Sequence, residues 1–218
     1  MFMALKKCHD IAQYFKRQLS KKKFCVDRSG HRTIELVGAC FEADRPAIFG
    51  KPNDAYIQQE IAWYDSQICN INAMDPVPEQ WRLTANASGD INSNYGALIY
   101  SADYDNQYEH CLNELRNNLK SRRATMIYTR PSIWHEYNES GKNDFICTNA
   151  VTYYGRDSRL HAVVQMRSND VVYGYKNDRA WQSVILSRLS DDLGMTPGRM
   201  IWQVQNLHVY ERHFKLIA

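Results

Sequence analysis

The chain has 218 residues, of which 44% are hydrophobic and 23% are charged, and its formal net charge is +3. This length suits one domain with a substantial core, and the composition is ordinary for a soluble globular protein. The charge is too small to indicate nucleic-acid binding. No apolar stretch reaches the ~20 residues of a membrane span, and the charged residues Lys6, Lys7 and Asp10 interrupt any secretory leader. We therefore expect a single cytoplasmic domain over residues 1–218, with no membrane or nucleic-acid partner.

The cysteines give no metal or redox motif. None forms a CxxC pair, and in a chain without a leader such scattered thiols fit a reducing compartment. We therefore expect no bound metal and free thiols at Cys8, Cys25, Cys40, Cys69, Cys111 and Cys147.

Helical spacing of apolar residues predicts a first helix over residues 5–19. A turn at residues 27–30 favours a hairpin connection to a strand over 33–41. A helix then begins near Asn53, whose side-chain oxygen is suited to cap it. We expect its buried stripe to consist of Ile57, Ile61, Tyr64 and Ile68.

Glu60 lies at the shoulder of that stripe, where it is either a surface residue or an acid aimed into a cleft. The segment 70–93 reads as a loop, and a helix follows with apolar positions at Tyr108, Cys111, Leu112 and Leu115.

The second half of the chain reads mainly as strands. We expect strands over 124–129, around Cys147, over 162–166 and over 200–210, with a loop over 131–143. One helix interrupts them, indicated by helical spacing of the apolar residues Trp181, Val184, Ile185, Leu189 and Leu193. Strands and helices mix without regular alternation, which predicts an α+β fold.

Two polar segments stand out from this pattern. The strand over 162–166 ends in Arg167-Ser168-Asn169-Asp170, a group able to hold a small anionic ligand, and Cys147 lies twenty residues upstream. Taken alone, Cys147 is also compatible with a core position, and Asp178 with a helix cap. Arg122 and Arg123 point to opposite sides of an extended chain, so one intramolecular salt bridge rarely serves both.

Taken together, the segments of this chain resemble the thymidylate synthase family over almost its whole length, and within it the phage-type deoxycytidylate 5-hydroxymethyltransferase branch. Any one motif is weak, but their order is specific. The motifs are Asp27-Arg28-Ser29-Gly30, Gln59-Glu60-Ile61-Ala62-Trp63, residues 89–96, Ser121-Arg122-Arg123, Cys147, residues 167–178 and His208-Val209-Tyr210.

The resemblance implies a large twisted mixed β-sheet flanked by helices, and a homodimer that packs sheet to sheet. Arg122 and Arg123 would then reach the phosphate in the partner's site, because guanidinium groups suit phosphate. The nucleotide-binding residues implied are Arg28, Arg122, Arg123, Arg167, Ser168, Asn169, Asp178, His208 and Tyr210. A phage-encoded member would work in the host cell cytoplasm.

By the same resemblance, Cys147 is the nucleophile that adds to C6 of a pyrimidine, and Glu60, Tyr95 and Asp178 complete the catalytic set. The co-substrate implied is 5,10-methylenetetrahydrofolate, with no metal. The folate-binding residues implied are Trp81, Asp170 and Gly174.

Asp178 stands where the methylating members have Asn, which favours dCMP as substrate, since a carboxylate accepts from the cytosine amino group. Other departures are Thr148 for a His, Asn169 for a Cys and Thr84 for a Trp. The sequence also stops at Ala218, before the segment that closes over the folate in typical members, and a wetter pocket would suit water capture and 5-hydroxymethyl-dCMP. The alternatives are a dCMP methylase, a dUMP-specific synthase and a non-catalytic nucleotide binder.

Overall fold

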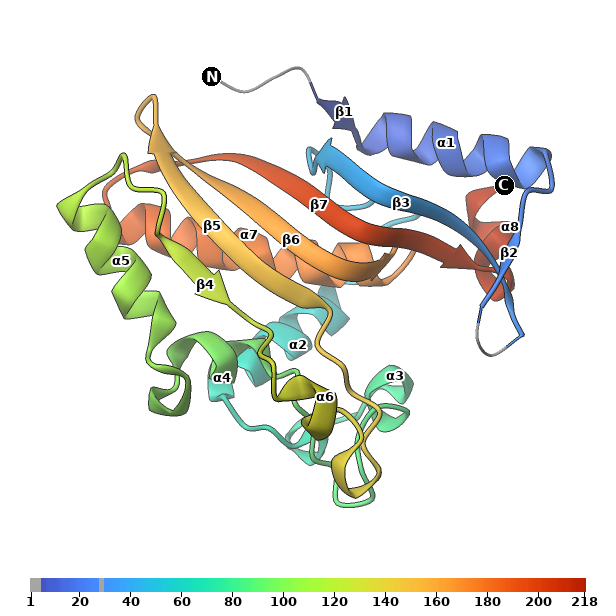
Figure 1. The fold of residues 1–218 in the computed structure, drawn as a ribbon, viewed down its shortest axis with the longest axis horizontal. Coiled ribbons are helices and arrows are strands. Elements are labelled where there is room, and N and C mark those ends of the chain that lie inside the picture. Colours follow the sequence, from blue (N-terminus) through green and yellow to red (C-terminus); the bar gives the residue numbers. More distant parts are fainter. Residues whose placement is uncertain (1–4, 28–29) are drawn as a thin grey trace. The chain divides into compact units, whose positions relative to one another are not determined.

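A computed structural model describes residues 5–27 and 30–218, so the predicted site residue Arg28 lies outside the described residues. The chain divides into two compact units (Figure 1). Unit 1 comprises Met1–Pro52 and Tyr153–Ala218, and unit 2 comprises Asn53–Thr152.

Unit 1 is built on long strands. Its strands are β1 (Lys6–Lys7), β2 (Cys25–Val26), β3 (Arg32–Glu42), β6 (Arg159–Asp170) and β7 (Thr196–Tyr210). Its helices are α1 (Cys8–Ser20), α7 (Gly174–Asp192) and α8 (Phe214–Ile217), with a 3₁₀ turn η4 (Glu211–His213). Strand β5 (Thr148–Arg156) begins in unit 2 and ends in unit 1. The strands of the described residues follow the order β1-β3-β7-β6-β5-β4, in which β4 (Thr125–Ile127) belongs to unit 2, and β2 is paired to β3.

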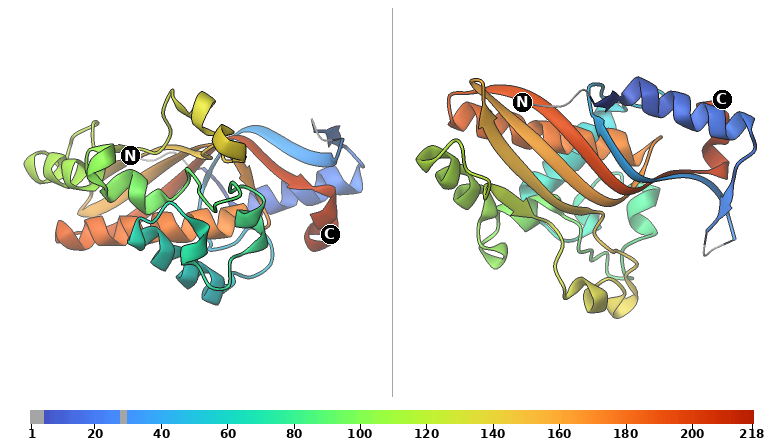
Figure 2. Two further views of the ribbon diagram at one scale, coloured as in Figure 1. Left: turned by 90° about the horizontal axis from the view of Figure 1, so that it is seen from below. Right: turned by 45° about the horizontal axis from the view of Figure 1, so that its top comes forward.

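The central strands set the architecture of unit 1. β3 runs antiparallel to β7, whereas β6 runs parallel to β7, with Val164 opposite Trp202 and Asp170 opposite His208. A parallel pair needs a crossover connection, and α7 supplies it. Figure 2 shows α7 running along one face of these strands. The core between them is aromatic, and its fully buried side chains include Tyr175, Trp181 and Trp202.

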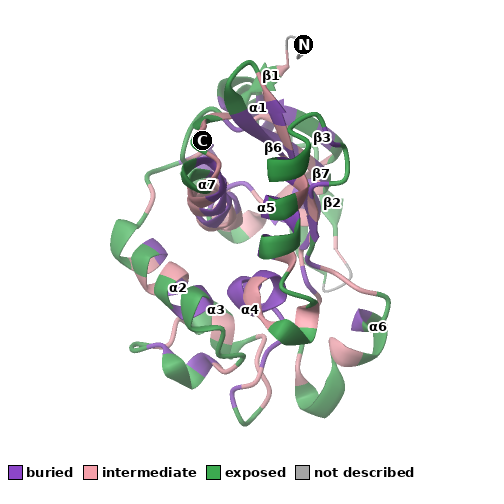
Figure 3. Cartoon of the chain, turned by 90° about the vertical axis from the view of Figure 1, so that its left-hand side faces the viewer, coloured by how far each residue is buried: buried purple, intermediate pink, exposed green. Residues whose placement is uncertain are grey.

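Unit 2 consists mainly of short helices. They are α2 (Asp54–Ser66), α3 (Glu79–Arg82), α4 (Tyr95–Tyr100), α5 (Gln107–Asn117) and α6 (Ile133–Glu136), with 3₁₀ turns η1 (Ile71–Ala73), η2 (Ala102–Tyr104) and η3 (Glu139–Gly141). Its strand β4 (Thr125–Ile127) pairs antiparallel with the first half of β5. Figure 3 shows α4 as a buried helix, in agreement with the burial of Tyr95 to Ile99.

The predicted α+β class and the mixed sheet are confirmed. The hairpin between β2 and β3 forms as expected, and Asn53 caps α2 by accepting a hydrogen bond from the Tyr56 N–H at 3.2 Å. The four apolar positions predicted for α5 are all buried.

Three local predictions need correction. In the predicted stripe of α2, Ile57 and Tyr64 are buried, whereas Ile61 is half-buried and Ile68 is exposed because α2 ends at Ser66. Glu60 and Trp63 complete the buried face. Both predicted loops contain short helices, and of these only η1 has a side-chain cap, in which Asn70 accepts from the Asn72 N–H. The strand expected over 124–129 is shorter, at Thr125–Ile127.

In the part of the chain that the structure describes, none of the helices combines the length and apolar character needed to cross a membrane.

Gly96 sets the distance between α2 and α4. A Cβ at this position would lie 1.7 Å from the backbone carbonyl oxygen of Tyr64, a contact that neither backbone can relieve without moving. The motif Tyr95-Gly96 therefore requires glycine for packing.

We expect Gly96→Ala to lower the free energy of unfolding by about 3 kcal/mol or more, because overpacking against backbone is costly. The control is Ala97→Gly in the same turn, which adds no atom and should cost about 1 kcal/mol through helix propensity. Urea unfolding measures both, and equal losses would contradict this account.

Candidate active site

Glu60 is the buried acid of unit 2. Its Oε1 accepts hydrogen bonds from the Tyr56 hydroxyl at 2.7 Å and from the Trp81 indole at 3.0 Å. The side chain is buried rather than exposed at the helix shoulder, and desolvation raises the pKa of Glu60 despite these two donors. A carboxyl that holds its proton to higher pH than an exposed Glu is suited to proton transfer.

The structure therefore brings together Glu60 and Trp81, two of the predicted site residues. Sequence reasoning missed Tyr56, although its position four residues before Glu60 on one helix was an available signal. Trp81 also packs edge-on against Trp63, with ring centroids 4.9 Å apart. This contact further restrains the indole that donates to Glu60.

Tyr95 is the first residue of α4, and its ring is fixed by aromatic neighbours. It stacks on Tyr64 with centroids 5.3 Å apart and meets Tyr128 edge-on at 5.1 Å. Its hydroxyl accepts a hydrogen bond of 3.0 Å from the Thr148 hydroxyl. Thr148, which replaces the His of the methylating members, directly follows Cys147. Its hydroxyl therefore connects Tyr95 to the segment that carries the thiol.

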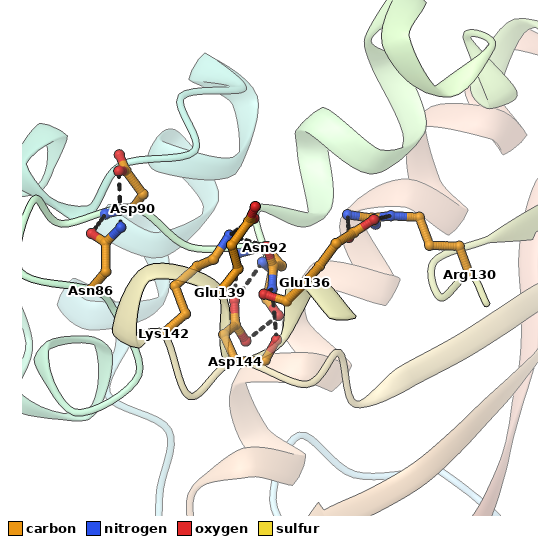
Figure 4. Close-up of polar contacts among 9 residues, drawn as sticks. Asn86, Asp90, Asn92, Arg130, Glu136, Glu139, Lys142 and Asp144 are labelled. Atoms are coloured by element: carbon orange, nitrogen blue, oxygen red, sulfur yellow. Dashed lines mark hydrogen bonds and ion pairs between the residues drawn. The ribbon is translucent and has the colours of Figure 1, made fainter. Parts of the chain in front are cut away.

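A cluster centred on Asp144 holds the two chain segments that carry Tyr95 and Cys147 (Figure 4). The buried Asp144 carboxylate accepts from the backbone N–H groups of Asn92 and Ser93 at 2.6 and 2.8 Å, and from the Ser93 hydroxyl at 2.6 Å. The Asn92 amide donates to the Asp144 carbonyl at 2.9 Å. These bonds fix the start of α4 against the segment three residues before Cys147.

Cys147 lies immediately before β5 rather than inside a strand, and it is half-buried. Its Sγ lies 3.8 Å from the Phe145 carbonyl oxygen. The backbone is anchored before this residue by the Asp144 cluster and after it by the pairing of Ala150 to Thr152 with β4. The partial exposure distinguishes this thiol from the buried Cys8 and Cys111.

Arg122 and Arg123 precede β4, and both side chains are exposed. Arg123 has a partner in its own chain, which the sequence did not suggest. Its Nη2 lies 3.0 Å from Glu114 Oε1, and its side chain remains 83% exposed. An ion pair this exposed contributes little to stability and leaves the guanidinium able to exchange partners.

In unit 1, the parallel pairing of β6 and β7 gathers five of the nine predicted nucleotide-binding residues at one edge of the sheet, where both strands end. Ser168 lies opposite Asn206 and Asp170 opposite His208, so the carboxyl ends of both strands coincide. This edge carries the residues Arg167, Ser168, Asn169, Asp170, His208 and Tyr210. Such an edge is a common location for ligand sites.

His208 is a half-buried imidazole at this edge. Desolvation lowers the pKa of His208, while the nearby Asp170 carboxylate acts in the opposite direction. Its ring meets that of Tyr210 edge-on, with centroids 5.0 Å apart. A neutral His and a Tyr hydroxyl can each donate or accept a hydrogen bond, as contact with a sugar hydroxyl requires.

Asp178 lies inside the first turns of α7, so the interpretation of Asn177-Asp178 as a helix cap is wrong. Its Oδ2 accepts a hydrogen bond of 2.7 Å from the Asn169 amide nitrogen. The Asn169 amide oxygen in turn accepts from the Trp202 indole at 3.1 Å. Sequence reasoning missed Trp202, and no local pattern indicates this contact between strands.

Asp170 and Gly174 shape the turn that leads into α7. Asp170 Oδ1 accepts from the backbone N–H groups of Val172 and Tyr173 at 2.9 and 2.6 Å. A Cβ on Gly174 would lie 3.2 Å from the Asn169 amide nitrogen, so the glycine allows the helix to start close to that side chain.

Within residues 5–27 and 30–218, no group of three or more His, Cys, Asp and Glu side chains could hold a metal ion.

Comparison with known proteins agrees with this arrangement. The sequence model of the family described as thymidylate synthase matches residues 12–218. Deoxycytidylate 5-hydroxymethyltransferase of Enterobacteria phage T4 is 49% identical over 207 residues, which cover 91% of this chain and 84% of that protein. The protein of the same name from Enterobacteria phage T2 gives the same values. Thymidylate synthase of Fusobacterium nucleatum is 29% identical over 64% of this chain and 49% of that protein. A match of this extent, on a chain whose strand edge and thiol segment carry the expected motifs, establishes that the protein belongs to the thymidylate synthase family.

Proposed function

We propose that this protein transfers a one-carbon unit from 5,10-methylenetetrahydrofolate to C5 of dCMP, and that capture of water gives 5-hydroxymethyl-dCMP. The observation that carries the proposal is the Asp178 carboxylate, held by Asn169 at the edge where β6 ends. The similarity to phage deoxycytidylate 5-hydroxymethyltransferases supports the same assignment.

The reaction requires a covalent step because C5 of a pyrimidine is a weak nucleophile. Addition of the Cys147 thiolate to C6 converts the ring to an enamine, whose C5 then attacks the one-carbon donor. The folate supplies that carbon, and Trp81 contributes an aromatic surface for it. Loss of the C5 proton with departure of tetrahydrofolate then leaves an exocyclic methylene at C5. Addition of water to that methylene carbon and departure of the Cys147 thiolate from C6 complete the turnover.

Glu60 and Tyr95 are the groups suited to move protons in these steps. The raised pKa of Glu60 lets it hold a proton near neutral pH better than an exposed Glu does, and it lies in contact with Trp81. The Tyr95 hydroxyl is hydrogen-bonded to Thr148, the residue next to the proposed nucleophile. Both are therefore assigned to proton transfer and to the positioning of water.

Base recognition rests on the acceptor-only character of an ionised Asp178. A carboxylate accepts from the cytosine amino group, and it also accepts from N3 once thiolate addition has led to protonation of that nitrogen. The second contact forms along the reaction, which is the kind of binding that accelerates a step. Against uracil, the carboxylate would meet the O4 acceptor.

The phosphate and sugar are assigned to the remaining residues. Arg28, Arg167 and Ser168 bind the phosphate, and His208 and Tyr210 bind the 3′-hydroxyl. In a homodimer, the exposed Arg122 and Arg123 reach the partner's phosphate, and Arg123 exchanges its weak contact with Glu114 for that ligand. Asp170 and Gly174 border the folate. The enzyme acts on free nucleotides in the cytoplasm.

A dCMP C5-methyltransferase is the second candidate, because Asp178 suits cytosine in either reaction. The two differ in the last step, where hydride from the folate replaces water. Methylation therefore converts the folate to dihydrofolate, and hydroxymethylation leaves tetrahydrofolate.

We expect purified protein with dCMP and methylenetetrahydrofolate to give a nucleotide heavier by one CH₂O unit, without the absorbance of dihydrofolate. Cys147→Ala should abolish turnover, which excludes a non-catalytic binder. Mass spectrometry and absorbance are recorded on the same sample. A gain of one CH₂ unit with dihydrofolate would establish the methylase instead.

We expect Asp178→Asn to lower kcat/KM for dCMP about 10- to 100-fold, the equivalent of about 1–3 kcal/mol for one bidentate base contact, and to raise kcat/KM for dUMP. Asp191→Asn is the matched control, since Asp191 is exposed on the same helix. An unchanged base preference in Asp178→Asn would refute the assignment of base recognition to this residue.

Mixing Arg122→Ala with Cys147→Ala tests the shared site. Half of the randomly mixed dimers are heterodimers with one intact site, so about a quarter of wild-type activity should return. The control mixture is Glu60→Gln with Cys147→Ala, because both residues serve the site of their own subunit and no activity should return. Equal activity in the two mixtures would rule out arginines that cross the dimer.

A further inference from the structure

We propose that Asn169 and Trp202 determine the orientation in which residue 178 meets the base, and so act as positioning residues for base selectivity. The inference rests on the proposed role of Asp178 in reading cytosine. It concerns a chain of two hydrogen bonds, from the Trp202 indole to Asn169 and from Asn169 to Asp178.

The first bond fixes the Asn169 amide in one orientation. An indole N–H can only donate, so the atom of Asn169 that faces it must be the oxygen. Trp202 is fully buried and Asn169 is 4% exposed, so neither group can exchange this bond for one to water. A flipped amide would place N–H against N–H and leave both donors unsatisfied.

The surroundings of the pair leave little room for other arrangements. The Trp202 ring packs edge-on against Tyr175, with centroids 5.5 Å apart. On the other side, Gly174 approaches so closely that a Cβ would lie 3.2 Å from the Asn169 amide nitrogen. Both neighbours hold Asn169 in the geometry that directs its N–H toward Asp178.

The second bond assigns different roles to the two carboxylate oxygens of Asp178. Oδ2 accepts the Asn169 N–H at 2.7 Å. We assign the amino group of cytosine to Oδ1. For an Asp the two oxygens are equivalent acceptors, so the fixed amide holds the carboxylate plane. For an Asn at position 178 the same amide would decide which end of the side chain faces the base.

We expect an Asn at position 178 to face the base in opposite orientations, depending on whether residue 169 is Asn or Asp. In Asp178→Asn, the Asn169 N–H requires the new carbonyl oxygen at the Oδ2 position, so the NH₂ group takes the Oδ1 position and matches uracil O4. In the double variant Asn169→Asp/Asp178→Asn, the carboxylate introduced at position 169 accepts from the Trp202 indole and from the NH₂ group of the new side chain at position 178. The carbonyl oxygen of residue 178 then takes the Oδ1 position and accepts from cytosine.

The experiment measures kcat/KM for dCMP and dUMP in the wild type, in Asp178→Asn and in Asn169→Asp/Asp178→Asn. We expect the dCMP/dUMP ratio to fall at least about tenfold in Asp178→Asn and to recover at least about tenfold in the double variant, as one base contact is reversed each time. Asn169→Asp alone sets two carboxylates against each other, so it should lower kcat/KM for dCMP, and the second substitution should restore it.

Trp202→Phe tests the other end of the chain of bonds, since it removes the N–H and keeps an aromatic ring. In the Asp178→Asn background it frees the amide of residue 169 to rotate, so the ratio should move at least about threefold from that of Asp178→Asn toward the wild type. The matched control is Trp181→Phe in the same background, because Trp181 is equally buried in unit 1, and it should leave the ratio unchanged.

The outcomes separate the two levels of the proposal. If Asp178→Asn itself leaves the ratio unchanged, base reading at residue 178 is refuted and the inference falls with it. If Asp178→Asn shifts the ratio but the double variant matches it, only the role of Asn169 is refuted. If the double variant does not fold, as judged by circular dichroism, equal ratios in the Trp202 and Trp181 variants overturn the inference.

Discussion

The parallel pairing of β6 with β7 is the constraint on which unit 1 depends. Two parallel neighbours cannot be joined by a hairpin, so the chain must cross over, and α7 is that crossover. The helix starts just after β6 ends, which places Asp178 in its first turns beside Asn169 at the strand end. The same pairing brings His208 opposite Asp170. Recognition groups distant in sequence are therefore gathered by one backbone arrangement.

Unit 2 depends in addition on buried carboxylates, whose hydrogen-bond donors come largely from other segments of the chain. Asp144 accepts three hydrogen bonds from Asn92 and Ser93, and Glu60 accepts two from Tyr56 and Trp81. A buried carboxylate without such donors would be costly, so each one specifies a local arrangement of chain. The segments that carry these donors gain a defined geometry in this way, as the proposed chemistry of the thiol and its neighbouring hydroxyls requires.

Much of this could be predicted from the sequence where the signal is local. Helical spacing located α1, α5 and α7, and the side-chain oxygen of Asn53 located the start of α2, because periodicity and capping act within a few residues. The ordered motifs indicated the family, which the comparison confirmed. The end of α2 was misjudged, since nothing local revealed that Ile68 lies beyond it.

The contacts that the sequence could not predict are those made between elements. The Arg123–Glu114 pair joins the start of a strand to a helix, and the Trp202–Asn169 bond joins two strands at positions that are not register partners. Neither periodicity nor motif spacing carries that information, because each contact depends on how long side chains reach across the fold.

The residues proposed to read the base and those proposed to move protons have separate sets of contacts in this chain. Asp178 is bonded in unit 1 to Asn169, which accepts from Trp202, whereas Glu60 is bonded within unit 2 to Tyr56 and Trp81. A substitution at position 169 or 178 therefore alters the donors and acceptors at position 178 without removing a partner of Glu60. If residue 178 reads the base as we propose, this separation lets the base preference change while the contacts of the acid stay as they are. Exchanging the side chains at positions 169 and 178 would then reverse the orientation of the group that faces the base.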